Sequence, residues 1–470
     1  MRGLLDRRAG PQRRGGGALP PFTALYLDGT GDYASVADAA ALTPAGAEWS
    51  IGGWVWTTTD AVRMLASKGN YSVSMSMFLE AGYAATADQM SAWHTIVAGD
   101  VGSSFTQCPR YSVPQSARWW YVACSFNGAE AVVGAGVGPQ NRVKMWIGAS
   151  PIWTRFTAAV YSTAVIDDTD SLYFGAFKNA GVVGAYPAQY QHDWCMWSRA
   201  LAQADVEAHI AGAPSQTGLI RRWFHQRHKV FDDGAAYPPI AVADAAYVAM
   251  PGALPRSVRK VHLIGDSITQ GTDPDWGAGP LYRGGWRRYA FDLALLRGVS
   301  QRSVSVGDRM TEEGHPCMHD GWAGAQWSQA EIIAACQGSG ALTPDAVLIS
   351  LGTNDIAGAG QPASVLETRF DARMEDLYTT GGLSTATPVG VWPIGELLAG
   401  GFNTIRDEFH AWLIATGIPA QRALGRNVVW VPHTYVAGDN AGSDTNVHLS
   451  DAGNQHLAAT LDAWLAANGC

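Results

Sequence analysis

Three residues in the second half of the chain could share one chemical step. Ser267 lies in the turn GDS after the apolar run at 261–264, where a serine hydroxyl is held free at the end of a buried strand. Asn354 follows another apolar run in LGTND, and His448 lies in VHLSDAG. An imidazole can take the serine proton, and an amide N–H can stabilise negative charge on a carbonyl oxygen. These residue types favour acyl transfer through a serine nucleophile.

The elements that must position these residues are alternating strands and helices from about Lys260 onwards. The strand-like segments are KVHLIG, RSVSVG, DAVLISLG, TPVGVWPI and NVVWVPH, and amphipathic helical segments separate and follow them. In residues 286–296 the apolar positions are predicted to form one helical face. This alternation predicts a parallel sheet covered on both faces. Sites in such sheets lie at the carboxyl ends of the strands, so Ser267, Asn354 and His448 can meet at one edge.

Four ordered motifs in residues 259–470 resemble those of the SGNH, or GDSL-type, hydrolase family. They are GDSIT, DGWAG, LGTND and VHLSDAG, and the form DGWAG is most similar to the acetylxylan-esterase-like carbohydrate esterase branch. The resemblance implies a three-layer, flavodoxin-like α/β domain with a parallel sheet. It also implies that Ser267 is the nucleophile and His448 the general base.

The resemblance also implies roles for groups around the nucleophile. The backbone N–H groups of Ser267 and Gly324, with Gly321 as the alternative to Gly324, and the amide of Asn354 would stabilise an oxyanion. The residues expected to line the substrate site are Asp266, Gly352, His319 and Trp322. His315 and His319 lie four apart, but no third ligand is evident and this chemistry needs no metal, so neither a metal nor another cofactor is expected.

The acid of the expected triad departs from the family pattern. The family places an aspartate three residues before the histidine, and this chain has Thr445 there. Asp444 is the favoured acid, reaching the imidazole through a one-residue bulge, with Asp439 as a distant alternative. A serine–histidine dyad helped by a backbone carbonyl is also open, because the acid only orients and stabilises the imidazole. Asp451 is better explained as a first-turn helix acid, with Ser450 as the N-cap.

Residues 21–212 have an all-β pattern of short alternating segments bounded by Gly, Asp, Asn and Pro. In RWWYVACSF both faces are apolar, which predicts the centre of a sheet sandwich. The segments LYLDGTGDYASVAD, WSIGGWVW, WWYVACSFNG and VKMWIGAS resemble concanavalin A-like, laminin-G-type jelly rolls, and a closing helix is expected at 203–210. Such modules often bind glycans, and many only pack against or present other domains. No Asp/Asn cluster assigns calcium to this region.

The remaining segments are a basic arm at 1–20 and a segment at 213–258. The arm is expected to be a flexible tail, or else to dock into a larger assembly, and it has no apolar stretch typical of a signal peptide. Residues 213–258 are expected to be an edge strand or packing segment that leads into a linker. The net charge of -9 argues against a nucleic-acid-binding body, and no apolar run predicts a membrane span. The six cysteines are expected to be mostly free and buried, with room for one disulfide.

The leading hypothesis is a serine esterase that removes O-acetyl groups from a polysaccharide, which the sandwich binds or positions. The chain would act outside the cell without a recognisable signal peptide. It would suit a phage virion component such as a tail fibre, acting on host surface polysaccharide as a homo-oligomer or within a virion assembly. The alternatives are a general esterase, lipase or thioesterase of the same fold, and a virion attachment or structural protein with a vestigial hydrolase.

Overall fold

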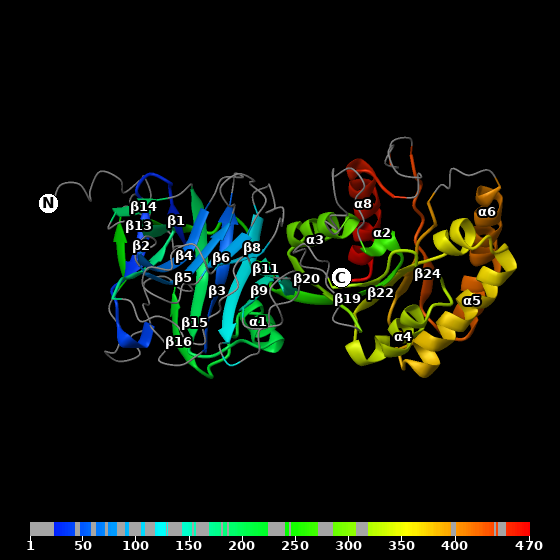
Figure 1. Cartoon of the computed structure of the whole chain (residues 1–470), viewed down its shortest axis with the longest axis horizontal. Coiled ribbons are helices and arrows are strands. Elements are labelled where there is room, and N and C mark those ends of the chain that lie inside the picture. The colour runs from blue at the N-terminus through cyan, green and yellow to red at the C-terminus, as the bar shows by residue number, and fades with distance from the viewer. Residues whose placement is uncertain are drawn as a thin grey trace, which may run out of the picture.

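The computed structural model describes residues 23–42, 48–57, 63–70, 74–81, 90–93, 105–108, 118–127, 129, 143–152, 155–156, 169–179, 182–185, 188–223, 240–243, 246–270, 285–306, 318–395, 401–436, 439 and 448–470. Antiparallel sheets form the first half of the molecule, and a parallel sheet with helices forms the second half (Figure 1). Within the described residues, none of the helices is long and apolar enough to cross a bilayer.

Two antiparallel sheets make up the first half. One sheet has the order β10-β9-β8-β3-β15-β1-β18, with β16 also on β15. Its strands are β1 (Thr23–Leu27), β3 (Glu48–Thr57), β8 (Arg118–Asn127), β9 (Val143–Ile147), β10 (Ser150–Ile152), β15 (Gln189–Trp197), β16 (Leu219–Trp223) and β18 (Ala246–Ala249). The other sheet has the order β11-β7-β6-β5-β4-β12-β2-β17, with β13 also on β4 and β14 on β13. Its strands are β2 (Tyr33–Val36), β4 (Arg63–Asn70), β5 (Ser74–Ala81), β6 (Met90–Trp93), β7 (Phe105–Cys108), β11 (Arg155–Phe156), β12 (Leu172–Phe174), β13 (Ala176–Asn179), β14 (Val182–Ala185) and β17 (Ile240–Ala243).

The strand β8 shows why the two sheets form a sandwich. Trp120 and Val122 point into a core shared with Val36 and Phe174 of the other sheet. The alternate residues, including Tyr121, point the other way into a second core that helix α1 (Gln203–Ile210) covers. Successive side chains of a strand alternate between its faces, so a segment that is apolar at both parities is buried on both sides. The predicted central strand and the predicted closing helix are both confirmed.

The segment at 213–258 adds three strands to this sandwich. β16 pairs with β15, and β17 and β18 pair with the edge strands β2 and β1. Part of the segment therefore completes both sheets before the chain enters β19 (Ser257–Gly265). Four cysteines of the described residues are free and buried: Cys124, Cys195, Cys336 and Cys470.

The second half contains a parallel sheet of order β20-β19-β22-β23-β24. Its further strands are β20 (Val299–Val304), β22 (Ala346–Ser350), β23 (Val389–Val391), β24 (Val428–Trp430) and the short β21 (Asp320–Gly321), which pairs with the end of β19. The helices are α2 (Ser267–Gln270), α3 (Trp286–Leu296), α4 (Ala330–Gly338), α5 (Ala363–Glu375), α6 (Phe402–Trp412), α7 (Ile418–Ala423) and α8 (Asp451–Ala467). Short 3₁₀ turns lie at Ala40–Leu42 and Ser339–Leu342, and π-helical turns at Asn354–Gly358, Asp376–Thr380 and Leu413–Gly417. When β19, β20, β22, β23 and β24 are numbered 1 to 5 along the chain, their order in the sheet is 2-1-3-4-5, which is that of flavodoxin-like sheets.

Helices cover both faces of this sheet, as the sequence predicts. On β22, Val347 and Ile349 point into a core formed with α4, α5 and α6. Ala346 and Leu348 point into the opposite core, formed with α3 and α8. The alternation of apolar residues along one short strand therefore produces three layers, because each face of the strand requires its own helical cover.

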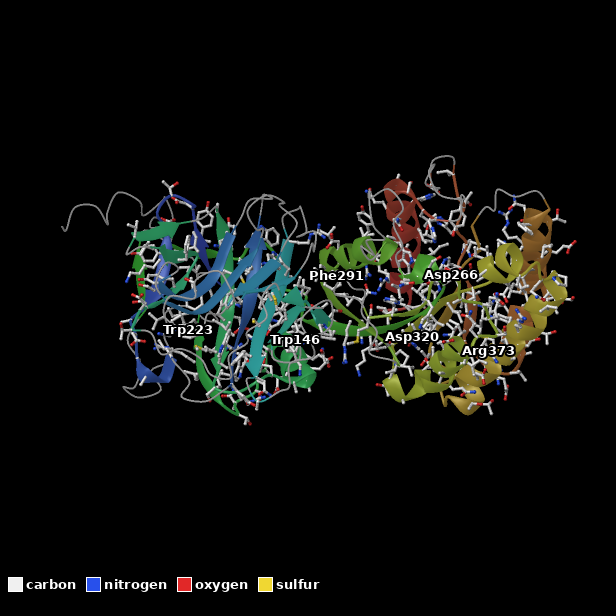
Figure 2. All side chains as sticks on the ribbon, viewed as in Figure 1. Trp146, Trp223, Asp266, Phe291, Asp320 and Arg373 are labelled. Carbon is white, nitrogen blue, oxygen red and sulfur yellow. The ribbon has the colours of Figure 1, made fainter. Side chains whose placement is uncertain are left out.

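The two halves share a buried contact through α3. Phe291 and Leu295 belong to the core of the sandwich, and Figure 2 shows Phe291 between the two halves. A Cβ at Gly148 would lie 2.9 Å from the Phe291 ring. Arg118 of β8 donates from Nη1 to the backbone oxygen of Asp292 at 2.8 Å. The apolar surface of α3 therefore comprises two faces, not the single face expected from its sequence.

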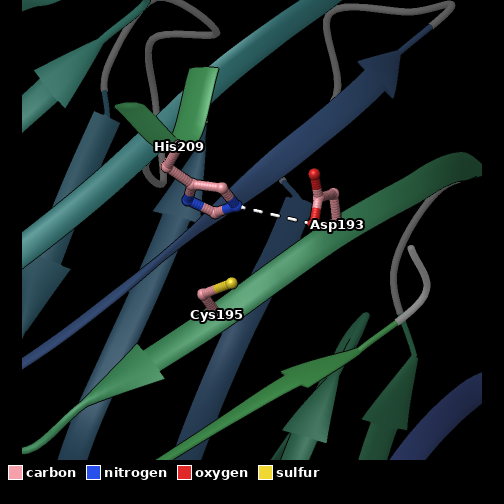
Figure 3. Close-up of side chains that lie close together, drawn as sticks. All are labelled: Asp193, Cys195 and His209. Carbon is pink, nitrogen blue, oxygen red and sulfur yellow. Dashed lines mark ion pairs between the residues drawn. The ribbon is translucent and has the colours of Figure 1, made fainter. Parts of the chain in front are cut away.

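A buried carboxylate joins the sandwich to the strand that leads into the second half. Asp193 lies at an irregularity of β15 with φ 54°, a left-handed conformation that aspartate tolerates better than most residues. Arg222 binds it through Nε at 2.5 Å, and Arg256, just before β19, through Nη2 at 3.3 Å. His209 of α1 faces it at 3.6 Å, as Figure 3 shows. Burial alone would raise the pKa of Asp193, but hydrogen bonds from His209 and Arg222 hold it well below its usual range.

We predict that Phe291→Ala lowers the free energy of unfolding by about 3–5 kcal/mol, because it leaves a cavity in the core of the sandwich. Denaturant unfolding followed by fluorescence measures the loss. Leu296→Ala on the same helix is the matched control, since that side chain is 54% exposed. It should change stability by less than about 0.5 kcal/mol. Equal effects of the two substitutions would show that α3 does not hold the halves together.

Candidate active site

Ser267 and His448 lie at the same edge of the parallel sheet. Ser267 begins α2 directly after β19, and His448 precedes α8. The distance from His448 Nε2 to Ser267 Oγ is 2.8 Å, across 181 positions of sequence. In this geometry the hydroxyl can donate to the imidazole, which can then accept its proton as the oxygen attacks a carbonyl carbon. The structure therefore brings together the two residues that the sequence places in the nucleophile and base roles.

The turn that carries Ser267 is held by its two preceding residues. At Gly265 a Cβ would lie 2.1 Å from Thr269 Oγ1, so only glycine fits. The buried carboxylate of Asp266 accepts the Ile268 N–H at 3.0 Å and a hydrogen bond from Thr353. Asp266 was expected to line the substrate site, but its carboxylate is bound inside the turn. It positions the serine, and burial raises its pKa to about 6.

The DGWAG loop presents Gly324 beside this turn. Trp322 donates its N–H to the Gly265 carbonyl at 3.2 Å, which fastens the loop to the end of β19. Gly324 is exposed with φ +75°, a conformation that favours glycine, and its N–H has no acceptor among the described residues. The N–H of the alternative, Gly321, is bonded to His319 Nδ1 at 3.0 Å. The geometry therefore favours Gly324 over Gly321 as an oxyanion donor.

Asn354 and Asp355 fasten the LGTND segment to the same loop. Asn354 Nδ2 donates to the Ala325 carbonyl at 3.1 Å, which orients the amide and leaves its second N–H for another acceptor. The buried carboxylate of Asp355 accepts the Trp327 N–H at 3.1 Å and pairs with Arg369. Sequence reasoning did not single out Asp355, although its place directly after Asn354 was the available signal.

A buried histidine–aspartate pair supports the loop from beneath. His262 Nε2 of β19 lies 2.7 Å from Asp320 Oδ2, and Figure 2 labels Asp320 below the sheet edge. Ser305 donates to the same carboxylate at 2.8 Å, and the Val306 N–H at 2.7 Å. Burial raises the pKa of Asp320, but these partners hold it below its ordinary value. Nothing in the local sequence indicates this pair, because its members lie on different strands.

The other residues expected to line the substrate site differ in their burial and in their contacts. His319 is buried and accepts the Gly321 N–H, so it helps to hold the loop, and its contact with substrate stays a prediction. Gly352 is also buried, with φ +125°, and a Cβ there would lie 2.5 Å from Ile394. Trp322 is partly buried against the core, and its contact with substrate stays a prediction. His315 lies outside the described residues.

The predicted acid of the triad, Asp444, lies outside the described residues, as does Thr445, so its role stays a prediction. The distant alternative, Asp439, is described, and its carboxylate lies 3.0 Å from Nδ1 of His456, not of His448. Asp439 therefore has a different partner from the one a triad acid requires. Ser450 accepts the N–H of the third helical residue at 3.1 Å, which confirms it as the N-cap of α8.

A polar cavity of about 340 Å³ lies beyond the carboxyl ends of β23 and β24. It is lined by Pro393, Ile394, Arg406, Asp407, His410, His433, Thr434 and Tyr435. The Tyr435 hydroxyl donates to the Pro393 carbonyl at 3.2 Å. Burial raises the pKa of Tyr435, and the nearby carboxylate of Asp266 raises it further. Tyr435 also packs against the hydrophobic cluster that contains Ile268 of the catalytic turn. The run PHTY after a predicted strand was the signal for this cavity.

Comparisons with known proteins agree with this arrangement in the second half. Residues 263–456 match the model of the GDSL-like Lipase/Acylhydrolase family. No curated protein is significantly similar to this chain in sequence.

Solved structures resemble one or both halves at low identity. A family 3 carbohydrate esterase of Clostridium thermocellum is 17% identical over 44% of this chain and 94% of its own, with a TM-score of 0.34. A heptameric SAP-like pentraxin of Limulus polyphemus is 11% identical over 49% of this chain and 96% of its own, with a TM-score of 0.35. A family two carbohydrate esterase of Clostridium thermocellum, in complex with cellohexaose, is 12% identical over 94% of this chain and 93% of its own, with a TM-score of 0.34.

We predict that Asp266→Asn makes the protein more stable than wild type as pH rises from 4 to 7. The folded carboxyl has a pKa of about 6, against an ordinary value of 3.8. Because the pKa is raised in the folded state, the contribution of this carboxyl group to the free energy of unfolding is fully present below pH 3.8. That contribution is lost as pH rises through 6. The loss should reach on the order of 3 kcal/mol, since one pKa unit equals about 1.4 kcal/mol. Asparagine keeps an acceptor oxygen without the charge.

Unfolding free energies of both proteins, measured from pH 4 to pH 8, test this expectation. Glu408→Gln on α6 removes an exposed carboxylate and serves as the matched control. A difference between Asp266→Asn and wild type that stays constant with pH would contradict it.

Proposed function

We propose that this GDSL-like carboxylic ester hydrolase removes O-acetyl groups from a polysaccharide by an acyl-enzyme mechanism. The observation that carries the proposal is the 2.8 Å contact between Ser267 Oγ and His448 Nε2. The domain that matches the family supplies the premise of ester hydrolysis. The acetyl group and the polysaccharide are the parts that are proposed.

The mechanism follows from the four groups at the sheet edge. Ser267 Oγ attacks the ester carbonyl as His448 Nε2 takes its proton, and the same imidazole returns the proton to the departing sugar hydroxyl. The oxyanion is stabilised by the N–H groups of Ser267 and Gly324 and by the free N–H of the Asn354 amide. Water activated by His448 then releases acetate and restores the serine. Asp444 remains the proposed partner of the imidazole.

The polar cavity supports a sugar in preference to a long acyl chain. Its lining includes a guanidinium, a carboxylate, two imidazoles and two hydroxyl groups, from Arg406, Asp407, His410, His433, Thr434 and Tyr435. Such groups pair with the hydroxyls of a sugar ring, whereas a fatty acyl chain requires an apolar channel. Because the cavity lies at the carboxyl ends of β23 and β24, in the sheet whose strand β19 leads into Ser267, a glycan there would present an acetyl group toward the serine.

The proposal extends to the sandwich, which we take to follow the concanavalin A-like jelly-roll pattern and to position the glycan. Most of its tryptophans are not available for stacking on sugars, because they are buried in the two cores: Trp49, Trp54, Trp119, Trp120, Trp146, Trp194, Trp197 and Trp223. The buried contact of Phe291 with the sandwich favours a fixed orientation of the two halves. This packing supports a sandwich that positions the glycan for Ser267 more than one that binds the glycan independently.

Acetate release from acetylated oligosaccharides tests the proposal. We expect Ser267→Ala to lose at least about 10⁴-fold in kcat, because both chemical steps require the hydroxyl. Ser364→Ala, at an exposed position of α5, is the matched control and should keep wild-type rates. Equal acetate release by wild type and Ser267→Ala would overturn the proposal. A series of esters with acyl chains from acetyl to octanoyl tests the polar substrate, and preference for octanoyl would favour a general esterase or lipase.

We predict that Asn354→Ala lowers kcat by about 100- to 1,000-fold with little change in KM, as expected for a lost oxyanion donor. The reason is that the amide would bind the charge that develops only in the transition state. Steady-state kinetics on a small acetyl ester measures the effect. Asn468→Ala, at the exposed C-terminus of α8, provides the comparison. A large rise in KM with unchanged kcat would assign Asn354 to substrate binding instead.

A further inference from the structure

We propose that His433, Asp439 and His456 form a binding site for a divalent transition-metal ion of the Zn²⁺ type. His433 lies in the loop after β24, Asp439 lies further along the chain, and His456 lies on α8. The site lies outside the proposed chemistry of Ser267 and His448 and would serve a structural purpose. It does not depend on which ester the protein hydrolyses.

The ligand atoms are close enough for one ion. One nitrogen or carboxylate oxygen from each residue lies within 4.8 Å of the others. The distance from His456 Nδ1 to Asp439 Oδ2 is 3.0 Å. Donor atoms around a tetrahedral zinc, at bond lengths of about 2.0–2.1 Å, lie about 3.3 Å from one another. Small side-chain rotations would therefore bring all three onto one ion.

His433 is prepared to act as a metal ligand. The Thr460 hydroxyl lies 3.4 Å from the His456 carbonyl, to which it donates, and its oxygen lies 3.0 Å from His433 Nδ1. The oxygen can therefore accept the Nδ1 proton, which leaves the lone pair on Nε2. Nε2 is buried and has no hydrogen-bond partner among the described residues.

Asp439 is held in place by its backbone and by its carboxylate. The Val436 N–H donates to Oδ2 at 2.8 Å, and the Ser450 N–H donates to the Asp439 backbone oxygen at 2.7 Å. A Cβ at Gly453 would lie 2.2 Å from that same oxygen, so α8 begins in close contact with Asp439. A bound ion would therefore tie the end of β24 to the helix that follows His448.

A second cluster of ligand-type residues shows the difference between a filled and an available site. Asp193, Cys195 and His209 also lie within reach of one ion, and Figure 3 shows them together. There Arg222 and Arg256 already bind the carboxylate, and all three residues are fully buried. At the proposed site, the ion pair of Asp439 within the described residues is with His456, whose side chain is 40% exposed. A metal ion can reach the proposed site from solvent, and no guanidinium of the described residues pairs with Asp439 there.

Cobalt and zinc titrations of the full-length, tag-free protein after chelator treatment test the site. We expect stoichiometric Co²⁺ to give the visible absorption of a four- or five-coordinate ion, and Zn²⁺ to displace it. Calorimetry should show that His433→Ala and His456→Gln each weaken Zn²⁺ binding by at least about tenfold. Thr460→Val should weaken it less, because it removes only the support of His433 Nδ1. Zn²⁺ should raise the Tm of wild type and not that of His456→Gln.

His410→Ala is the matched control. His410 lines the polar cavity beside His433, but its Nε2 accepts the Ile394 N–H and is therefore not available to a metal ion. It should keep wild-type affinity for Zn²⁺. His456 is partly exposed, so His456→Gln should fold, and circular dichroism checks this before titration. Absence of stoichiometric binding would overturn the proposal. Binding that survives in the double variant His433→Ala/His456→Gln would also overturn it, because the ion would then lie elsewhere.

Discussion

The hydrogen bond between Ser267 and His448 depends on the assembly of the whole parallel sheet. Its two ends are 181 positions apart, and they meet because β19 and the loop before α8 end at the same edge. The helices α3 and α8 share one core on one face of the sheet, which fixes the start of α8 against β19. A shift of about 1 Å in that packing would separate the hydroxyl from the imidazole and cost reactivity.

Buried carboxylates hold the loops of this edge. Asp266 lies inside the catalytic turn, Asp320 beneath the DGWAG loop, and Asp355 behind Asn354. Each pays a desolvation cost and is satisfied by backbone N–H groups together with a hydroxyl, a histidine or an arginine. Such groups stabilise a single loop geometry more than they stabilise the fold. The raised pKa of Asp266 indicates that part of the stability of the protein is given up for the position of the serine.

The sandwich packs directly against the second half of the molecule. Phe291 enters its core, and Arg256 before β19 binds the buried Asp193 of β15. Arg302 of β20 and Glu207 of α1 form a further ion pair at 2.5 Å. These contacts are apolar, charged and hydrogen-bonded at different points along the junction.

The sequence by itself determined the elements and the reacting pair. The central strand β8, the parallel strands, α1 at its observed bounds and the shared edge of Ser267 and His448 follow from periodicity and strand order, which are local or topological properties. Tertiary structure alone decided the inward carboxylate of Asp266, the pairing of His262 with Asp320, and the partner of Asp439. It also placed Phe291 in the core of the other half. The physical reason is that the burial and the partner of a side chain depend on which distant residues the assembled sheet and its helices bring within hydrogen-bonding distance. No local sequence pattern encodes that distance.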